Sequence, residues 1–463
     1  MVEAGSIKSA PASPAVGGAP VSDAELLVRM ARVPFSRWHM RARLVMGSAT
    51  FFDAFDVLAL AFVLPVLKGL WNLTPAQIGW LISIGYLGQF VGALGFGALA
   101  ERIGRVRTAT VAILLMSAMA FACAFAGSFP VLLACRFIQG VGVGGEVPVA
   151  AAYINEISPT ASRGRFFMLY EMVFPIGLMV TGQVGAWLVP AHGWQAMFLV
   201  GAVPGLVIAT LVARLPESPR WLMARGRSAD AERVVAGLEA STEQRVAAPA
   251  APPGPGPGAR TGWRELFSPF YRRRTLVVWG LWFGTYLVAN GLNNWLPTLY
   301  RSVYGLDLAA ALRAASMTNV VQVAITLACA LLVDRLGRRS WALACYAAAA
   351  GLFVALGAGG AGSVLMVGLL ATLAYGLLSS VNVLLYLYTP EIYPTRSRAL
   401  GTGLATACLR LGSSAGPALI GALVAGGRLA WVFLVFAGIC GACLLLATRM
   451  IETSGRALEE IAP

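Results

Sequence analysis

The sequence predicts an all-α membrane protein with twelve transmembrane helices in two six-helix halves. Three observations support this prediction. Of 463 residues, 58% are hydrophobic and only 12% are charged, whereas soluble domains carry about 25% charged residues. Apolar segments long enough to cross a bilayer, about 20 residues each, recur along the chain. Short charged motifs also occur twice, once in each half and in the same order.

Twelve segments have the length and composition of a membrane span. They are expected near 44–66, 77–100, 107–127, 130–153, 166–189, 193–213, 274–296, 308–333, 340–360, 363–388, 399–426 and 430–450. A Pro- and Gly-rich stretch separates the sixth span from the seventh and predicts a flexible connection. The predicted domains are an N-terminal tail with a membrane-surface segment (1–43), an N-terminal bundle (44–213), a central loop (214–273), a C-terminal bundle (274–450) and a C-terminal tail (451–463).

The net charge of +14 is distributed by membrane side. Most basic residues fall in the tails and in the loops on the side of both termini. The exceptions are Lys68, Arg301, Arg313 and Arg428 on the opposite side, and Arg136 and Arg410 inside spans. Basic residues of short loops stay in the cytoplasm, so both termini are predicted to be cytoplasmic and the protein to lie in the cytoplasmic (inner) membrane. Because topology accounts for the charge, no nucleic-acid partner is expected.

The segment before the first span, "RMARVPFSRWHMRAR" at 29–43, mixes basic and aromatic side chains. This composition favours a helix lying on the anionic inner leaflet, with an ordinary solvated lead-in as the alternative. The chain has seven cysteines, all in predicted spans, and two histidines, His39 and His192, outside them. We therefore expect no metal site.

Repeated motifs predict how the two halves are related. "EISPTASR" at 156–163 returns as "EIYPTRSR" at 391–398, and "ERIGRVR" at 101–107 as "DRLGRRS" at 334–340. "PESPR" at 216–220 is echoed by "IETSGR" at 451–456. Copies on one side of a membrane require an even number of spans per repeat, and six fits. Parallel six-helix repeats place a transporter's substrate site near the midplane between them.

The repeated carboxylates and arginines predict a gate at the cytoplasmic mouth, formed by weak ion pairs that separate when the halves rock. Topology signals combined with helix capping are the alternative. The predicted gate residues are Glu101, Arg102, Arg105, Glu156, Arg163, Glu217 and Arg220 in the first half, and Asp334, Arg335, Arg338, Glu391, Arg398 and Glu452 in the second.

Five ionisable residues of the first half lie inside predicted spans, where each is costly and therefore a candidate for function. They are Asp53 and Asp56 in "FFDAFD", Arg136 and Glu146 in the fourth span, and Glu171 in the fifth. The rise of a helix places Asp56 and Arg136 at similar depth, which predicts an ion pair. Glu146 and Glu171 are expected either to form a proton exit route or to bond to helix ends.

Several motifs carry a resemblance to a known family. "GxxxERxGRxR" at 97–107 resembles the signature of the major facilitator superfamily, with Glu101 where Asp is usual, and "RFIQGVGVGGEVPV" at 136–149 resembles its fourth-span motif. The resemblance covers 29–460. "PESPRWLMARGR" at 216–227 and "ETSGRALEEI" at 452–461 are similar to sugar-porter and organic-ion-transporter sequences. "RVPFSRWHMRAR" followed by "FFDAFD" looks like the aromatic-acid and related metabolite:proton symporters.

The resemblance implies the major facilitator fold and transport by alternating access. In proton-coupled sugar porters, an aspartate at the position matching Asp56 pairs with the fourth-span arginine, here Arg136, and its protonation couples transport. Asp53 is an equally good candidate on geometry, so the proton is assigned to either or both. The alternative is a permanent buried ion pair.

Arg410 is predicted near the middle of the eleventh span. Its planar guanidinium suits a carboxylate, and its segment resembles the eleventh span of organic-anion transporters. A structural ion pair is the alternative. Further substrate-binding candidates are polar residues in the spans, many of which are also expected to form interhelical hydrogen bonds: Gln183, Tyr286, Asn290, Asn293, Asn294, Asn319, Gln322, Tyr375 and Ser379.

The predicted function is proton-coupled symport of a small organic acid, including aromatic carboxylates, by a monomer with the proton as coupling ion and no cofactor. A sugar or polyol porter, a drug or organic-cation transporter, and a ligand sensor of transporter ancestry remain alternatives. An ATP-driven pump is excluded because neither lysine, Lys8 or Lys68, ends a phosphate-binding loop. No catalytic motif indicates an enzyme.

Overall fold

The computed structural model describes residues 22–157, 172–242, 263–359, 363–394, 397–454 and 461. Within these ranges, twelve helices are long and apolar enough to cross a membrane, which confirms the predicted fold class. The first six are α2 (Arg37–Trp71), α3 (Pro75–Ile103), α4 (Arg105–Ala124), α5 (Phe129–Ile157), α7 (Val173–His192) and α8 (Trp194–Ala213). The second six are α11 (Arg272–Ser302), α12 (Leu308–Leu336), α13 (Arg338–Ala358), α14 (Val364–Glu391), α15 (Arg398–Ala425) and α16 (Leu429–Ala447).

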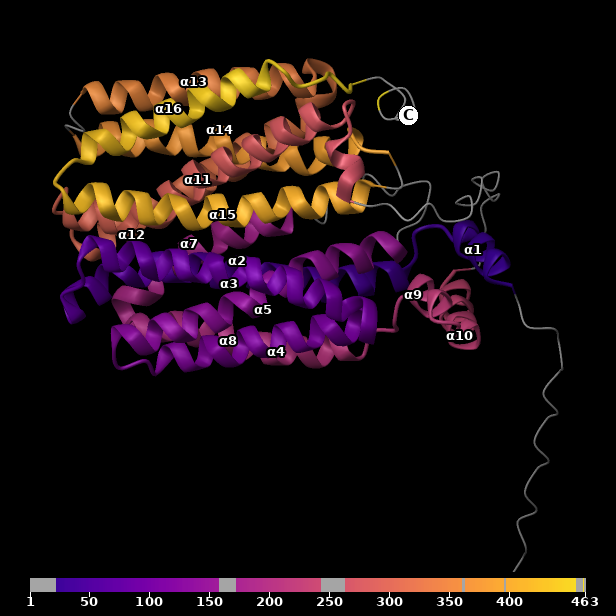
Figure 1. Cartoon of the computed structure of the whole chain (residues 1–463). Coiled ribbons are helices and arrows are strands. Elements are labelled where there is room, and N and C mark those ends of the chain that lie inside the picture. Colours follow the sequence, from indigo (N-terminus) through magenta and orange to yellow (C-terminus); the bar gives the residue numbers. More distant parts are fainter. Residues whose placement is uncertain are drawn as a thin grey trace, which may run out of the picture.

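The two sets of six helices form two halves that lie side by side (Figure 1). Across the boundary α3 packs against α15, α7 against α12 and α2 against α11. We call the end of the molecule that carries α1, Arg105 and Arg338 the basic end, and the other end the distal end. Figure 1 shows both ends of the described chain at the basic end.

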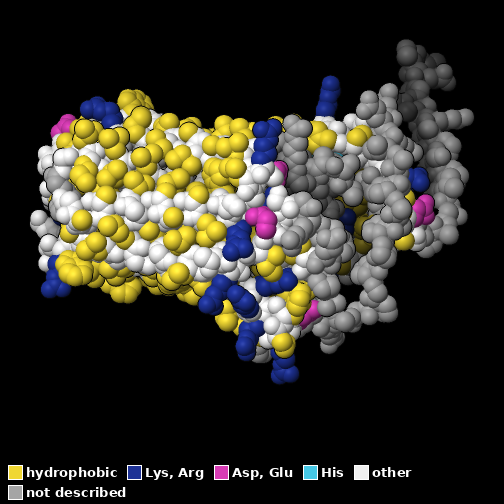
Figure 2. Space-filling model, turned by 90° about the horizontal axis from the view of Figure 1, so that it is seen from above, with side chains coloured by type: hydrophobic (Ala, Val, Ile, Leu, Met, Phe, Trp, Pro, Cys, Tyr) yellow, Lys and Arg dark blue, Asp and Glu magenta, His cyan; other side chains and the backbone are white. Residues whose placement is uncertain are grey.

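The outer surface of the bundle is apolar along its length. In Figure 2, hydrophobic side chains cover the bundle, and many of the visible Lys and Arg side chains gather toward the basic end. Leu94 of α3, Leu331 of α12 and Leu445 of α16 are among the exposed apolar residues. A surface of this kind is expected where lipid rather than water is the solvent.

Close approach of small residues closes the boundary between the halves near the distal end. The Ser83 hydroxyl on α3 donates to the Ser414 carbonyl on α15 at 2.6 Å, and the Ser414 hydroxyl donates to the Ser83 carbonyl at 3.2 Å. A Cβ on Gly79 would lie 2.8 Å from the Pro417 carbonyl oxygen. Glycine therefore permits this contact, as in other closely packed membrane helices.

The segment before the first span differs from the predicted membrane-surface helix. Helix α1 (Asp23–Arg32) ends before the segment does, and α2 begins at Arg37. The apolar face of α1, with Leu26 and Met30, is buried against α9 (Pro219–Ala224) and α10 (Ser228–Glu239) of the central loop. An amphipathic face can be covered by protein as well as by lipid, and here the central loop supplies the cover.

We call α1, α9 and α10 the helical cap. Arg29 of α1 forms ion pairs with Glu239 at 2.7 Å and Glu232 at 3.6 Å. The Trp221 indole N–H of α9 donates to the Glu101 carbonyl at the end of α3 at 3.0 Å. The helical cap is therefore bound to the N-terminal half by this hydrogen bond.

Replacing Gly79 by valine is expected to open the distal contact. Overpacking costs about 1–3 kcal/mol, which shifts a two-state equilibrium by about 5- to 150-fold. The measurement is the labelling rate of a single cysteine at position 83, in a variant without other cysteines, by an impermeant maleimide added from the distal side. Gly97→Val is the matched control, because a Cβ there meets nothing within 4 Å. Equal rates in the two variants would contradict the role of this contact.

Candidate functional site

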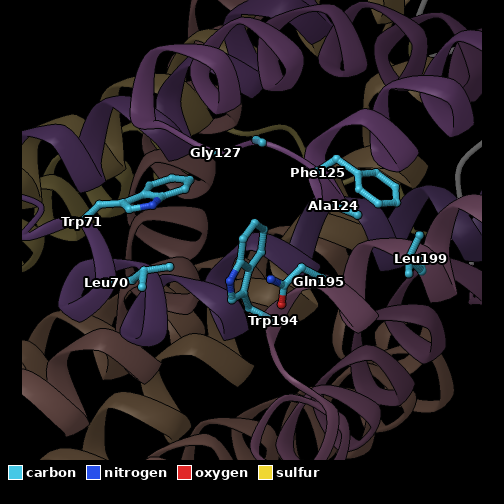
Figure 3. Close-up of a pocket in the computed structure, with 9 residues that line it drawn as sticks. Leu70, Trp71, Ala124, Phe125, Gly127, Trp194, Gln195 and Leu199 are labelled. Atoms are coloured by element: carbon cyan, nitrogen blue, oxygen red, sulfur yellow. The ribbon is translucent and has the colours of Figure 1, made fainter.

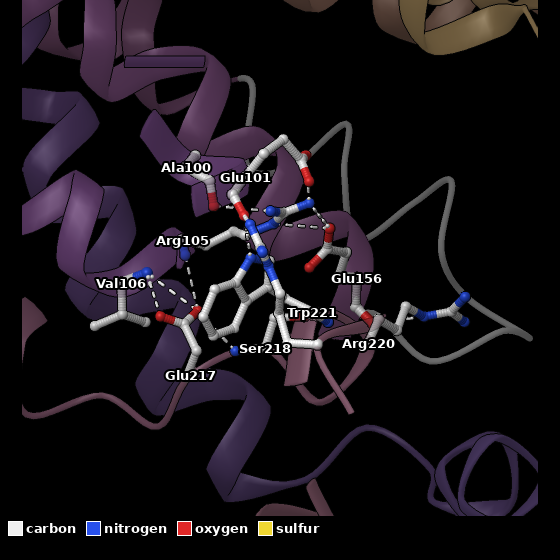
Figure 4. A network of polar contacts seen from close by, with 10 residues as sticks. Ala100, Glu101, Arg105, Val106, Glu156, Glu217, Ser218, Arg220 and Trp221 are labelled. Carbon is white, nitrogen blue, oxygen red and sulfur yellow. Dashed lines mark hydrogen bonds and ion pairs between the residues drawn. The ribbon is translucent and has the colours of Figure 1, made fainter. Parts of the chain in front are cut away.

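The basic end carries a carboxylate that caps a helix in each half. In the first half, Gly104 has a positive φ of 106° and α4 begins at the next residue. The Glu217 carboxylate accepts the backbone N–H groups of Arg105 at 2.9 Å and Val106 at 3.1 Å (Figure 4). A negative charge at the start of a helix satisfies unpaired donors and opposes the positive end of the helix dipole.

The second half repeats this arrangement. Gly337 has a φ of 88°, and the Glu452 carboxylate accepts the N–H groups of Arg338 at 2.8 Å and Arg339 at 3.0 Å. Burial raises the pKa of Glu452, but the N–H donors of Ser454, Arg338, Arg339 and Thr453 outweigh it, so the pKa is lowered overall. The same cap at equivalent places shows that the two motifs are structural equivalents.

Each cap adjoins an arginine with two carboxylate partners. Arg105 contacts Glu101 at 2.9 Å and Glu156 at 3.1 Å, and Arg338 contacts Asp334 at 2.8 Å and Glu391 at 3.6 Å. All these ion pairs stay within one half. The structure therefore brings these predicted gate carboxylates and arginines together. Their ion pairs join helices of the same half and do not join the two halves to each other.

The remaining predicted gate residues have separate positions. The Arg220 Nε donates to the Glu156 carbonyl at 3.2 Å (Figure 4). Arg102 and Arg335 are exposed, and Arg398 is partly buried at the start of α15. Arg163, and Glu171 of the predicted proton-coupling group, lie outside the described residues.

The buried charges of the first half meet between α2 and α5, although the predicted Asp56–Arg136 ion pair is not formed. The Arg136 Nη1 donates to the Asp56 backbone carbonyl at 3.3 Å and to the Gln139 Oε1 at 2.7 Å. The Asp56 carboxylate instead packs beside Gly201 of α8, where a Cβ would lie 2.4 Å from Oδ1. Depth places the residues at one level, but the direction of each side chain around its helix decides the contact. Gln139 could have been found from its position three residues after Arg136.

Glu146 is fully buried, and the Thr50 hydroxyl of α2 donates to it at 3.2 Å. This contact is with a side chain of a neighbouring helix rather than with a helix end. Asp53, one turn along α2 from Thr50, interacts electrostatically with Glu146 and Asp56 on its own half and with Arg410 on the other. Asp53 is therefore the first-span carboxylate that faces the second half.

Arg410 lies at the boundary between the halves with only 6% of its surface exposed. Its Nη1 donates to the Thr406 carbonyl of its own helix at 3.1 Å, and its Nε has no hydrogen-bond partner among the described residues. The guanidinium interacts electrostatically with Tyr386, Asp53 and Tyr286. A buried cation beside one acid and two aromatic rings can bind an aromatic anion.

An aromatic cluster adjoins Arg410. Trp282 stacks on Tyr286 at 5.5 Å between ring centroids and meets Tyr386 edge-on at 4.6 Å. Of these three residues, only Tyr286 was predicted from the sequence. Trp282 could have been predicted from its position four residues before Tyr286, on the same helix face. Tyr386 belongs to α14, and no sequence pattern predicts its position beside them.

Several of the other predicted polar residues bond to each other, and others bond to neighbouring residues in the spans. Asn290 donates to Ser413 at 2.7 Å, Asn293 to Asn319 at 3.4 Å, and Tyr375 to Gln322 at 3.2 Å, with Ser379 interacting with Tyr375. Asn294 donates to the Tyr86 hydroxyl at 3.1 Å, and Gln183 to the Ser316 carbonyl at 3.4 Å, both across the halves.

Comparison with known proteins identifies the class. Residues 44–463 match the family model described as "Sugar (and other) transporter", so the chain belongs to this family of major facilitator superfamily transporters. It is therefore a membrane transporter of small molecules and not an enzyme.

Relatives and solved structures agree with this class. The chain is 33% identical to the niacin transporter NiaP of Acinetobacter baylyi, over 94% of this chain and 99% of that protein. It is 32% identical to a gallate transporter of Pseudomonas putida, over 81% of this chain and 83% of that protein. The fold is similar to the xylose transporter XylE of E. coli in a partially occluded inward open conformation, with a TM-score of 0.73, 17% identity, and coverage of 91% of this chain and 100% of that chain.

Replacing Glu452 by glutamine is expected to lower the melting temperature at pH 7.5, since loss of a helix N-cap costs about 1 kcal/mol. Because the pKa of Glu452 is lowered in the folded protein, its carboxylate stabilises the fold above the unfolded pKa and loses this effect as the pH falls through the folded pKa. The difference from the unsubstituted protein should therefore shrink in acid. Thermal unfolding across pH measures it, with the exposed Glu25→Gln as control; a difference that does not depend on pH would contradict the capping role.

Proposed function

We propose that the protein couples protons to the uptake of a small aromatic carboxylate. The observation that carries this proposal is Arg410, a buried cation placed beside Tyr286 and Tyr386 and opposite Asp53. The niacin and gallate transporters among the relatives are named for such compounds. A neutral sugar offers no charge to Arg410, whose Nε has no hydrogen-bond partner among the described residues, so the site gives the sugar alternative less support.

We propose that Asp53 carries the proton. Asp53 interacts electrostatically with Arg410 across the boundary between the halves, and in the proposed cycle it is ionised while the site is empty. A substrate carboxylate bound to Arg410 neutralises that cation, and the Asp53 carboxylate then favours its protonated form because its partner is occupied. Asp56 holds α2 in place. Its carboxylate packs against Gly201, and its backbone carbonyl accepts a hydrogen bond from Arg136. Glu146, joined to Thr50 near Asp53, gives the proton a next acceptor.

We propose that the basic end faces the cytoplasm, in a cytoplasmic membrane, because short loops rich in arginine remain on that side. The contact of Ser83 with Ser414 at the distal end then closes the side opposite the cytoplasm. One chain supplies both Arg410 and Asp53, so a monomer suffices for transport. The proton serves as the coupling ion, and no cofactor takes part.

Arg410→Ala is expected to weaken binding of nicotinate or benzoate by about 10- to 150-fold, since a hydrogen bond to a charged group contributes about 1.5–3 kcal/mol. The measurement is the ligand-induced rise in melting temperature, together with uptake into proteoliposomes. Arg313→Ala, at an exposed arginine of α12, is the matched control. A folded Arg410→Ala protein with unchanged affinity would overturn the anion site.

Asp53→Asn is expected to separate transport from the proton gradient. The variant should still exchange labelled for unlabelled substrate, because exchange needs no net proton movement, but it should lose accumulation driven by an inward proton gradient. Asp56→Asn is the comparison and should retain gradient-driven accumulation where it folds. Accumulation by Asp53→Asn at the unsubstituted rate would assign the proton to another residue.

A further inference from the structure

A pocket of about 530 Å³ lies at the distal end, and none of its lining residues belongs to the site at Arg410. Figure 3 shows residues that line it. It is lined by the end of α2, the end of α4 with the loop that follows, and the start of α8. Every lining residue belongs to the N-terminal half. The pocket therefore does not depend on the boundary between the halves, and its shape can persist while they rock. Its volume is in the range of small-molecule sites.

The walls of the pocket are aromatic. Trp71 of α2 and Trp194 of α8 meet edge-on with 6.0 Å between ring centroids, and Phe125 lines the pocket beside them (Figure 3). Leu70 and Leu199 complete the apolar lining. Aromatic rings prefer such offset and edge-on neighbours, so the walls suit a planar ring.

Polar donors gather at one side of this pocket. Helix α8 begins at Trp194, directly after Gly193, which has a φ of 81° and provides no side-chain cap. Its first N–H groups thus lack a side-chain acceptor and carry the positive end of the helix dipole. Trp194 is 6% exposed, and its indole N–H makes no hydrogen bond within the described part of the chain. Gln195 also lines the pocket, through an exposed side chain.

We propose that this pocket is a second binding site for small aromatic carboxylates. The ring packs against the Trp71 and Trp194 walls of the pocket, and the carboxylate accepts hydrogen bonds from the first turn of α8, the Trp194 indole and the Gln195 amide. Helix N-termini bind anions in this way. The ligand class rests on the proposed function, because the pocket opens on the side from which an imported acid arrives. Bound there, the acid is held at the entrance before the halves rock.

The test uses the full chain in lipid nanodiscs and radiolabelled nicotinate. Equilibrium binding to the unsubstituted protein is expected to show two sites. Arg410→Ala removes the central one and leaves one weaker site, and adding Gln195→Leu or Trp71→Leu is expected to weaken that site at least tenfold. In a chain that keeps Arg410, Gln195→Leu should raise the KM for uptake and leave kcat unchanged. Trp187→Leu, at an exposed tryptophan of α7, is the matched control.

Three results would overturn the proposal. Binding to Arg410→Ala that is unchanged by both Gln195→Leu and Trp71→Leu would place the second site elsewhere. Equal competition by cyclohexanecarboxylate would show that the aromatic walls do not recognise the ring. Displacement only by a long-chain fatty acid would identify the pocket as a lipid site. The proposed function has a separate test. If Arg410→Ala transports at the unsubstituted rate, the central site is wrong, and this result does not depend on nicotinate binding at the pocket.

Discussion

The structure depends most on the cost of holding ionised groups in a medium that cannot solvate them. A charge at the centre of a membrane helix costs at least about 2.5–3.5 kcal/mol on insertion scales. Asp53, Asp56, Arg136, Glu146 and Arg410 are all buried inside the spans. The first four lie in one half, on two helices held together by Arg136 and Thr50. Only Arg410 lies in the other half, so its nearest acid, Asp53, is a partner that movement of the halves can change.

The remaining charges sit at the basic end, where they keep each half rigid. The Glu217 and Glu452 carboxylates join the segment after the last helix of a half to the start of its third helix, and Arg105 and Arg338 join that start to the fourth helix. The distal contact, by contrast, consists of small residues and two reciprocal serine hydrogen bonds. The ion pairs among the described residues at the basic end lie within the halves, whereas close packing and neutral hydrogen bonds join the halves. Each half can therefore rock as a rigid body without breaking an ion pair at the basic end.

The sequence was sufficient for the fold because its signals were periodic and repeated. Apolar runs placed the spans, and two copies of a charged motif placed the halves. Rotation about a helix is not encoded in this way. Depth along α2 and α5 put Asp56 level with Arg136, but the Asp56 carboxylate turns toward Gly201. The apolar residues of α1 likewise predicted a buried face, but the sequence did not distinguish burial in lipid from burial against the central loop. Tyr386 interacts electrostatically with Arg410 from another helix, a proximity that only tertiary packing reveals.

Charge balance at the boundary explains how the proposed coupling can be strict. In the proposed cycle, an ionised Asp53 balances Arg410 when the site is empty, and a bound substrate anion balances Arg410 when Asp53 is protonated. A site holding the anion alone or the proton alone carries one uncompensated charge. If that charge costs at least about 2.5–3.5 kcal/mol in the closed boundary, such a state is about a hundredfold rarer in the transition between open states. Anion and proton therefore cross together, because the same pair of residues is neutral only when both are present or both are absent.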